Sequence, residues 1–373
     1  MKLKIPGLIV KKMKQYLRFI LAIVLIANAS DTFSQSVSDM KLKDFRPKSI
    51  YKTPVSQIKK AKYPVIDMHS HPYATSDAEI AQWVKTMDAK GIQKTIILTM
   101  ATGAKFDSLY AAYAKYGDRF ELWCGFDYTG YDKPGFGPAA VKELERCYKI
   151  GARGIGELGD KGIGEFYSEP VPGIGLHLDD ARMKPLLEKC AELGMPINVH
   201  IAEPIWMYET MDSTNDGLMN AFEWKIDKTQ KNLLGFDALI QTLENAVRDN
   251  PKTTFIACHY ANCNHDLEKL GILLNKYPNL YADVAARFAE ASVVPRYTLA
   301  FHKKYQDRLV YGTDNGMDPE MYEITFRIFE SLDEHFYAEM FGYHWAYNGL
   351  GIPDKILKKL YLTNAQKILS GKK

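Results

Sequence analysis

The chain has 373 residues and a formal net charge of +3, and its length suits a single large α/β domain. Residues 1–34 hold six basic residues and one acidic residue, so the remaining chain carries a net charge of −2. The basic excess therefore gives no support for binding to nucleic acid.

Residues 1–34 have the pattern of a signal peptide. Basic residues precede an apolar run over residues 19–29, which is too short to span a membrane comfortably. Small residues follow this run, and we expect cleavage after Ala29 or after Ser34. The mature protein would then be exported, periplasmic or extracellular, without stable membrane insertion; an uncleaved anchor helix is the alternative. A polar, lysine-rich lead-in over residues 35–62 precedes a domain expected over residues 63–373.

The first strand expected in this domain, over residues 65–68, runs into His69, Ser70 and His71. Its β-branched and apolar residues favour a short, buried strand, and Pro72 ends it. Since side chains alternate along a strand, two histidines two residues apart point the same way. Two imidazoles on one side of a strand end can bind one metal ion, at roughly 2.0–2.1 Å each. A turn with two solvated histidines is the plain alternative.

Seven more short, apolar segments have the composition of strands, and helical patterns separate them. The eight strands are expected over residues 65–68, 95–100, 120–126, 154–157, 196–200, 254–259, 280–283 and 309–311. The helices are expected over residues 76–90, 106–115, 139–149, 180–193, 236–248, 266–276, 292–304, 320–332 and, near the C-terminus, 354–361. Ser76 and Glu79 form a capping box for the first helix, and Gly91 ends it. Eight strands, each followed by a helix, predict the (β/α)8 or TIM barrel of the α/β class.

The five cysteines show no CxxC spacing, and their odd number argues against a full disulfide framework. Cys124 and Cys258 fall in expected strands, where a free cysteine usually behaves as a small buried hydrophobic residue. A pair between Cys258 and Cys263 is the alternative in an exported protein.

Side chains that can bind a metal ion gather where the expected strands end. In a (β/α)8 barrel, the chemistry sits at the C-terminal ends of the strands and in the loops that follow them. These positions hold His69, His71, Glu157, His200, His259 and Asp314. Four of the nine histidines fall there, which scattered histidines would rarely do. For any one of these histidines, a hydrogen-bonded structural role is the alternative.

Several segments resemble the amidohydrolase superfamily, and within it the amidohydrolase-2 branch of hydrolases and non-oxidative decarboxylases. The matching segments are VIDMHSH, GARGIGELGD, LDDARMKPLLEKCAELGMPINVH, TTFIACHYAN, YPNLYADVAAR, DRLVYGTD and LYLTNAQKIL, which cover about residues 60–370. The resemblance implies a metal-dependent hydrolase type of barrel. It implies that His69, His71, His200 and Asp314 bind a metal ion. His259 would bind a second ion or act in catalysis.

Glu157 stands where some members of the superfamily carry a carboxylated lysine that bridges two metal ions. Others carry a glutamate that binds metal, and members with one metal ion can have neither. The resemblance therefore implies one or two ions, with Glu157 as a metal ligand or bridge. A pair with Lys161 or Arg153 is the alternative for this carboxylate.

The types of ligand indicate the chemistry. Imidazole and carboxylate groups suit Zn²⁺, with Mn²⁺ or Fe²⁺ as alternatives. A divalent ion with an open position lowers the pKa of bound water from 15.7 toward roughly 7. Asp314 can accept a proton from that water, and His259 can hydrogen-bond to the water or to a developing oxyanion. We therefore expect Asp314 and His259 to be catalytic.

Three side chains near the strand ends are candidates for binding a small-molecule substrate. Arg287 follows the seventh strand and could hold a carboxylate in a bidentate pair; a salt bridge to Asp283 or Glu290 is the alternative. Tyr73 closely follows the two histidines of the first strand. Trp206 lies in a long aromatic loop after the fifth strand, and a packed cover over the barrel rim is the alternative there.

Three interpretations of the function remain open. The first is a metal-dependent hydrolase of a small amide, lactone or ester. The second keeps the same metal site but decarboxylates a small carboxylic acid, with Arg287 holding the carboxylate. The third is a non-catalytic binding barrel, since a fold alone does not define a function. The sequence is also compatible with a homo-oligomer.

Overall fold

The computed structural model describes residues 37–134, 136–165 and 171–371. The chain divides into two compact units, residues 1–46 and residues 47–373. In the first unit, the described part contains two short 3-10 helices, η1 (Val37–Asp39) and η2 (Leu42–Asp44). The predicted signal peptide lies outside the described residues, and the predicted lead-in over residues 35–62 is divided between the two units.

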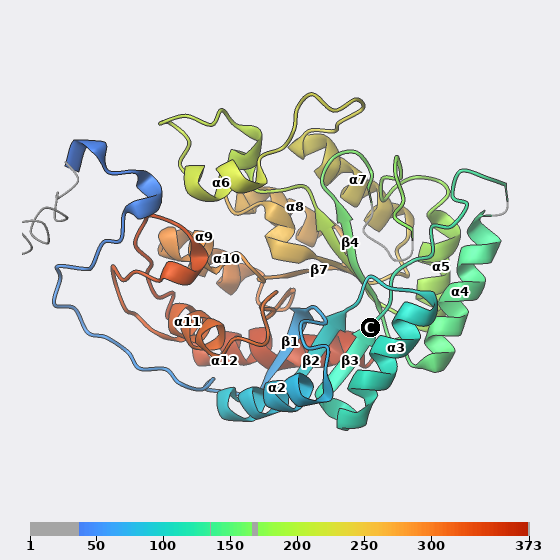
Figure 1. The fold of residues 1–373 in the computed structure, drawn as a ribbon, viewed down its shortest axis with the longest axis horizontal. Helices are drawn as coiled ribbons and strands as arrows, with labels where there is room; N and C mark the ends of the chain where they lie inside the picture. The colour runs from blue at the N-terminus through green and yellow to red at the C-terminus, as the bar shows by residue number, and fades with distance from the viewer. Residues whose placement is uncertain (1–36, 135, 166–170, 372–373) are drawn as a thin grey trace, which may run out of the picture. The chain divides into compact units, whose positions relative to one another are not determined.

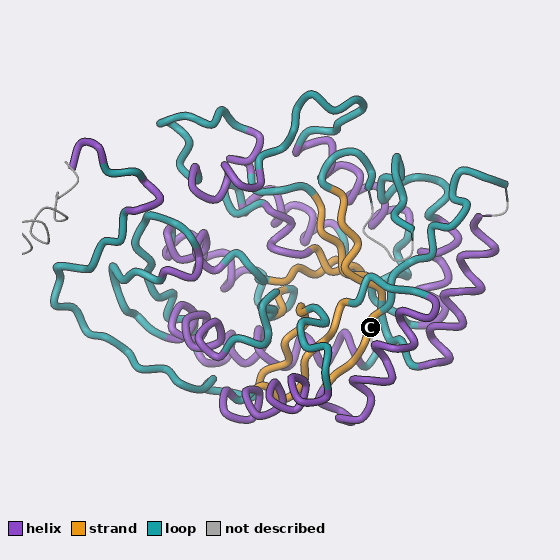
Figure 2. The backbone as a smooth tube through the Cα atoms, viewed as in Figure 1, coloured by secondary structure: helices purple, strands orange, loops and turns teal. Residues whose placement is uncertain are grey.

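Eight strands lie at the centre of the second unit, as Figure 1 and Figure 2 show. They are β1 (Val65–Ser70), β2 (Ile92–Leu98), β3 (Phe120–Trp123), β4 (Ile155–Asp160), β5 (Ile197–Ile201), β6 (Phe255–Ala257), β7 (Leu280–Asp283) and β8 (Leu309–Val310). All eight strands stand where the sequence predicted them, with shifted ends. Every residue of β1, β4 and β5 is buried, because helices cover one face and the barrel interior covers the other.

Helices surround these strands on the outside (Figure 2). They are α2 (Asp77–Lys90), α3 (Gly103–Tyr113), α4 (Phe136–Ile150), α5 (Lys184–Leu193), α6 (Leu218–Trp224), α7 (Phe236–Asp249), α8 (Leu267–Lys276), α9 (Phe288–Val293), α10 (Pro295–Lys304), α11 (Pro319–Glu330), α12 (Asp354–Lys358) and α13 (Asn364–Leu369). The capping box is confirmed, because the Ser76 side chain accepts from the Glu79 N–H and Glu79 accepts from the Ser76 N–H. Gly91 ends α2 in the left-handed conformation, as predicted.

Several predicted elements differ from the structure: the helix predicted over residues 292–304 is divided into α9 and α10, and α6 lies in a segment where no helix was predicted. The helix predicted from residue 180 begins only at Lys184, because Asp180 instead accepts hydrogen bonds from the backbone and side chain of Arg182 in a turn. The strand predicted over residues 254–259 ends at Ala257. The next residues form the irregular turn η5 (Cys258–Asn262), so His259 follows the strand and does not belong to it.

The strands pair in parallel as a three-stranded sheet, β1-β2-β3, and a five-stranded sheet, β4-β5-β6-β7-β8. Backbone hydrogen bonds join the two sheets at both seams. At one seam, Cys124 N–H donates to the Gly154 carbonyl (3.0 Å), and Gly156 N–H donates to the Cys124 carbonyl (2.9 Å). At the other, Met68 N–H donates to the Tyr311 carbonyl (2.9 Å). The fold is therefore the predicted (β/α)8 barrel, in which backbone hydrogen bonds join the two parallel sheets to each other along both edges.

Side chains from six of the strands meet in one apolar cluster with two residues of α13. The cluster consists of Ile66, Met68, Ile96, Leu98, Trp123, Ile256, Tyr281, Val310, Ala365 and Ile368. A cluster that draws on strands from both sheets can only lie inside the barrel. Apolar packing thus fills the interior next to α13.

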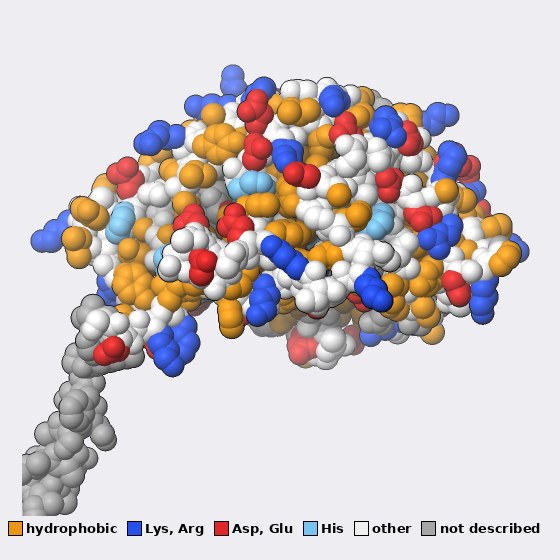
Figure 3. Space-filling view, turned by 90° about the horizontal axis from the view of Figure 1, so that it is seen from above, with side chains coloured by type: hydrophobic (Ala, Val, Ile, Leu, Met, Phe, Trp, Pro, Cys, Tyr) orange, Lys and Arg blue, Asp and Glu red, His pale blue; other side chains and the backbone are white. Residues whose placement is uncertain are grey.

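All five cysteines are free and buried. This confirms the prediction that Cys124 and Cys258 are buried free thiols, and the alternative pair between Cys258 and Cys263 is wrong. On the face drawn in Figure 3, basic and acidic side chains are interspersed. No helix among the described residues is both long and apolar enough to cross a membrane.

Candidate metal centre

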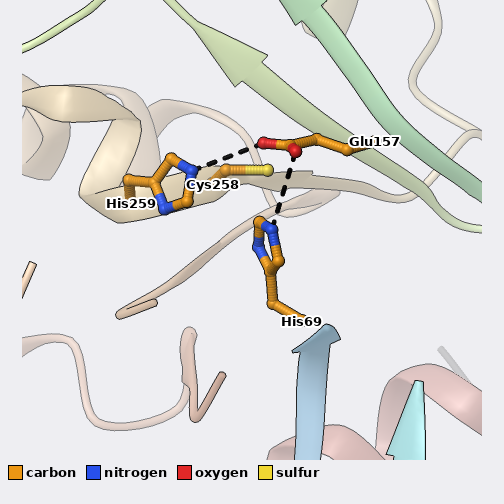
Figure 4. Close-up of side chains that lie close together, drawn as sticks. All are labelled: His69, Glu157, Cys258 and His259. Atoms are coloured by element: carbon orange, nitrogen blue, oxygen red, sulfur yellow. Dashed lines mark ion pairs between the residues drawn. The ribbon is translucent and has the colours of Figure 1, made fainter. Parts of the chain in front are cut away.

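The six residues predicted at the strand ends come together in the structure. His69 lies in β1, His71 directly after it, Glu157 in β4, His200 in β5, His259 in η5 after β6, and Asp314 after β8. Figure 4 shows two of the histidines, from β1 and η5, directed at the same carboxylate. Segments far apart in the sequence therefore place four imidazoles and two carboxylates at one end of the barrel.

Glu157 lies at the middle of this group. One of its carboxylate oxygens, Oε2, is 3.7 Å from His69 Nε2 and 3.3 Å from His71 Nε2. The other, Oε1, is 2.9 Å from His200 Nδ1 and 3.4 Å from His259 Nε2. The predicted alternative, a pair with Lys161 or Arg153, does not form among the described residues. Glu157 is only 7% exposed, so the imidazoles rather than water must stabilise its charge.

Asp314 forms the more open side of the centre. Its Oδ1 lies 3.2 Å from His71 Nε2 and 3.7 Å from His69 Nε2, and its side chain is 26% exposed. The Tyr73 hydroxyl donates to the Asp314 backbone carbonyl at 2.5 Å and lies 3.3 Å from Oδ1. Asp314 is therefore the carboxylate of the centre that a substrate or a water molecule can approach.

Two irregularities in the strand ladders direct these side chains inward. Between Asp67 and Ser70, β1 advances three residues while β2 advances two, and this interval contains His69. Between Ile155 and Leu158, β4 likewise has one extra residue relative to β5, and this interval contains Glu157. A bulge of this kind changes the alternation of side chains and can re-aim one of them. Simple alternation therefore does not explain how His69 and Glu157 meet.

The backbone is strained where several strands end. Non-glycine residues with φ between 53° and 63° stand one to four residues after the ends of five strands: Met100, Ala202, His259, Ala286 and Asp314, with Tyr260, Ala261 and Asn262 continuing the run after His259. L-residues rarely adopt this left-handed conformation, which costs on the order of 1–3 kcal/mol per residue. Such strain clusters at functional sites because the surrounding contacts hold the backbone in place.

Outer contacts determine which nitrogen each of three histidines offers to the centre. His69 Nδ1 lies 2.9 Å from the carboxylate of Asp283, and His71 Nδ1 lies 2.9 Å from the Leu98 carbonyl. His259 Nδ1 lies 2.9 Å from a backbone carbonyl in the loop after β7. These partners can only accept hydrogen bonds, so each Nδ1 carries a proton, and it is Nε2 of each ring that would bind a metal ion.

The charges of the centre shift the pKa values of its groups. Burial raises the pKa of Glu157, but the charge of His69 and a hydrogen bond from His200 outweigh burial and hold this pKa well below its usual range. Burial also raises the pKa of Asp314, but the hydrogen bond from His71 and the charge of His69 bring it to about 2. Burial lowers the pKa of His71, but hydrogen bonds to Asp314 and Glu157 raise it to about 9. The two carboxylates thus draw positive charge into the centre.

These residues fit a divalent metal ion. The Nε2 atom of His69 is sealed from solvent and has no hydrogen-bond partner, although it lies between two carboxylates. One group that could hold an ion consists of His69, His71 and Asp314, and a second consists of His69, Glu157, Cys258 and His259. Without an ion, protonated imidazoles donate to the two carboxylates, as the raised pKa of His71 indicates; a divalent cation bound by the same nitrogen and oxygen atoms would take the place of those protons.

Arg287 lies beside the centre, and its guanidinium is only partly engaged. Its Nε donates to Asn262 Oδ1 at 2.9 Å. Its ion pairs with Glu203 and Glu290 are both 3.8 Å long, which is beyond hydrogen-bond distance. Of the two predicted salt-bridge partners, Glu290 lies 3.8 Å from Arg287 without a hydrogen bond. The other, Asp283, is hydrogen-bonded to His69 instead.

The two aromatic residues predicted to contact substrate have different surroundings. Tyr73 is 44% exposed and positions Asp314 through its hydroxyl. Trp206 is half-buried in η4 (Ile205–Tyr208), and its ring meets the edge of Trp345 with 6.3 Å between the ring centroids. A Cβ on Gly217 would lie 2.4 Å from the Trp206 ring, so this loop packs as a cover. Substrate binding by either residue stays a prediction.

The sequence analysis gave no role to two buried carboxylates that lie beside histidines of the centre. Asp283 ends β7 and was considered only as a partner of Arg287, although its place at a strand end was a usable signal. Glu203 follows β5 by two residues and pairs with Lys161, 3.5 Å from His200 Nε2. No periodic pattern marks Glu203, because it stands in a loop whose path depends on contacts with other loops.

Comparisons with known proteins agree with this geometry. A family model described as amidohydrolase matches residues 57–370. A putative amidohydrolase from Staphylococcus aureus has a similar solved structure, with 17% identity, 82% of this chain and 99% of that chain covered, and a TM-score of 0.52. The 5-carboxyvanillate decarboxylase from Novosphingobium aromaticivorans, solved with manganese and 4-hydroxy-3-methoxy-5-nitrobenzoic acid, has 14% identity, 85% and 100% coverage, and a TM-score of 0.50. No curated protein matches the sequence. At these identities the solved structures support the barrel fold alone.

A glycine beside His69 provides a test of the centre. A Cβ on Gly312 would lie 2.7 Å from His69 Cβ, so Gly312→Ala must displace the His69 side chain. We expect this variant to stay folded but to bind Zn²⁺ about 10–100-fold more weakly, as when the support of a ligand is lost. Competition with a chelator measures the affinity, and circular dichroism checks the fold.

Gly235→Ala is the matched control, because no atom lies within 4 Å of its added Cβ. Wild-type zinc affinity in Gly312→Ala would show that the position of His69 does not matter for metal binding.

Proposed function

This chain belongs to the amidohydrolase family, and from that premise we propose that it is a metal-dependent hydrolase of a small amide, lactone or ester. The observation that carries the proposal is the convergence of four imidazoles on the buried carboxylate of Glu157, with the more open Asp314 beside them. Zinc is the proposed ion because imidazole and carboxylate ligands suit it, and manganese or iron are the alternatives.

We assign the metal ligands as His69, His71, Glu157, His200 and Asp314. A divalent ion held by these residues lowers the pKa of a water molecule and polarises a carbonyl group. With one ion, His69, His71, His200 and Asp314 would supply the ligands, and Glu157 would remain a hydrogen-bond partner of the histidines. With two ions, Glu157 is placed to serve both, since its two oxygens face different pairs of histidines.

Asp314 is the proposed general base. It stays charged down to low pH, because the pKa of its carboxyl group is lowered to about 2. Its side chain is more exposed than that of Glu157, so a water molecule can reach Oδ1. The proton taken from that water at Oδ1 is then available for the leaving group of the substrate. The Tyr73 hydroxyl holds the Asp314 backbone and limits its movement during this transfer.

His259 acts as an acceptor in this scheme. Burial lowers its pKa, which keeps the ring neutral, and the Ala285 carbonyl holds the proton on Nδ1. The Nε2 atom therefore offers a lone pair, which suits a metal ligand or an acceptor of a hydrogen bond from water. Donation to an oxyanion would require a second proton on the ring.

Arg287, Tyr73 and Trp206 are the proposed substrate contacts. The Arg287 side chain is 11% exposed, its Nη1 donates to the Ala286 carbonyl at 3.1 Å, and among the described residues it forms no hydrogen bond to a carboxylate, so Nη2 can bind a carbonyl or carboxylate oxygen. This feature also favours the second candidate function, decarboxylation of a small carboxylic acid. In that case Arg287 would hold the carboxylate and no water would be activated.

We also propose that the protein is exported. The support is the sequence of residues 1–34, in which a basic segment precedes an apolar run and small residues. The mature protein should begin at Ser30 or Gln35, as N-terminal sequencing of the native protein can determine. A native protein that still carries residues 1–28 would contradict export by cleavage.

The role of Asp314 is tested by Asp314→Asn. The variant keeps the shape of the side chain and loses the charge that accepts the proton. We expect the metal content to remain while turnover falls by roughly 10²-fold or more. Elemental analysis and initial rates on a panel of lactones, esters and amides measure the two effects.

Asp318→Asn is the control for this variant, because Asp318 caps α11 and an asparagine can cap a helix equally well. An Asp314→Asn enzyme as active as wild type would end the hydrolase proposal. Wild-type protein that binds no metal after reconstitution with Zn²⁺ or Mn²⁺ would end it as well.

The number of ions is tested by Glu157→Gln. In a centre with two ions, the loss of a shared negative ligand should lower the content toward one ion per chain. In a centre with one ion, occupancy should remain the same. Elemental analysis after dialysis gives the stoichiometry, with Glu145→Gln as a control at the protein surface. Two ions retained in Glu157→Gln would show that Glu157 does not bind the second ion.

A further inference from the structure

Glu203 is a buried carboxylate next to the centre to which no role has yet been assigned. It is 4% exposed and lies two residues after β5. Its Oε1 forms an ion pair with Lys161 and lies 3.5 Å from His200 Nε2. Its Oε2 lies 3.8 Å from Arg287 Nη2. One carboxylate thus touches a residue after β4, a histidine of β5 and an arginine after β7.

His200 is oriented differently from the other three histidines. It turns Nδ1 toward Glu157, at 2.9 Å, whereas His69, His71 and His259 turn Nε2 inward. The outer acceptors of those three rings meet Nδ1, so the outer acceptor of His200 has to meet Nε2. The Nε2 atom of His200 is sealed from solvent and lacks a hydrogen bond, and among the described residues the other carboxylate within 4 Å of the ring nitrogens is that of Glu203.

The backbone around Glu203 is held on both sides. The Glu203 N–H donates to the Tyr208 hydroxyl at 3.1 Å. The Asn262 side chain donates to the carbonyls of Ile201 and Ala202, at 3.2 and 3.0 Å. The carboxylate therefore approaches His200 from a fixed position, which a positioning role requires.

We propose that Glu203 is a positioning residue: it accepts the Nε2–H of His200 and so presents the lone pair of Nδ1 to the metal ion. The proposal rests on the proposed metal-dependent function. Its physical basis is that a neutral imidazole carries one proton, and an acceptor fixed beside one nitrogen leaves the other nitrogen free to bind metal. Partners of this kind raise metal affinity about 10–100-fold.

A purely structural role for Glu203 is the competing explanation. In that case the carboxylate would serve only to neutralise Lys161 and Arg287, and its effect on metal binding would come through the loop. Lys161→Met separates the two roles, because it removes the ion pair on Oε1 and leaves the contact with His200. Glu203→Gln keeps an acceptor oxygen and removes the charge, so it tests rescue by the conservative variant.

Zinc affinity is the first measurement, made by competition with a chelator on the full-length mature protein. We expect Glu203→Ala to lose about 10–100-fold in affinity, with Glu203→Gln closer to wild type and Lys161→Met unchanged. Equal losses in Glu203→Ala and Lys161→Met would overturn the proposal, as would wild-type affinity in Glu203→Ala. Circular dichroism checks that each variant is folded.

Nuclear magnetic resonance of the ¹⁵N-labelled histidine rings is the second measurement. His200 should carry a proton on Nε2 in wild type, both with and without zinc, and zinc should remove the proton from Nδ1 only. A His200 without a proton on Nε2 in either state would overturn the proposal. If the protein bound no zinc, the proposed function would fail, and comparison of the Nε2 proton of His200 between wild type and Glu203→Ala in the metal-free samples would still decide the role of Glu203.

Discussion

The buried carboxylate of Glu157 is the constraint on which the rest of the centre depends. A charged group this far from water needs compensating partners, and it finds them in four imidazoles that come from β1, its end, β5 and the turn after β6. His200 lies in, and His259 follows, a strand of the same sheet as Glu157, whereas His69 and His71 come from the other sheet. Closure of the barrel is therefore what brings the second pair of imidazoles to this carboxylate.

The backbone near the centre departs from regular strand geometry in order to place these side chains, and this departure costs free energy. β1 has one extra residue relative to β2 in the interval that contains His69, and β4 has one relative to β5 in the interval that contains Glu157. Strained left-handed residues follow five of the strands. The apolar interior near α13 and the helices around the strands supply the burial that offsets this strain. Apolar packing around and inside the barrel thus supplies the stability, while the C-terminal ends of the strands depart from ideal geometry to place polar groups.

Hydrogen-bond acceptors behind the histidines determine which ring nitrogen faces the centre. Asp283 and two backbone carbonyls hold protons on the outer nitrogens of His69, His71 and His259, and so turn Nε2 of each ring inward. The same reasoning assigns His200 to Glu203. The inner nitrogens then face carboxylates, and a divalent ion bound by both would take the place of the protons that the imidazoles otherwise donate. The partly exposed carboxylate of Asp314 and the partly engaged Arg287 lie beside the proposed ion site, where a substrate can approach.

The sequence by itself determined the eight strands, their order and the strand ends that carry the centre. It could do so because buried strands need apolar runs, helices need periodicity and caps, and the C-terminal ends of barrel strands all face one way. Those local rules named His69, His71, Glu157, His200, His259 and Asp314 before any contact was known. Only the tertiary structure decided that His69 and Glu157 meet through bulges, that His259 stands in a turn, and that Asp283 and Glu203 support the histidines. The physical reason is that bulges, loop paths and hydrogen-bond partners depend on residues distant in sequence, which no local pattern can encode.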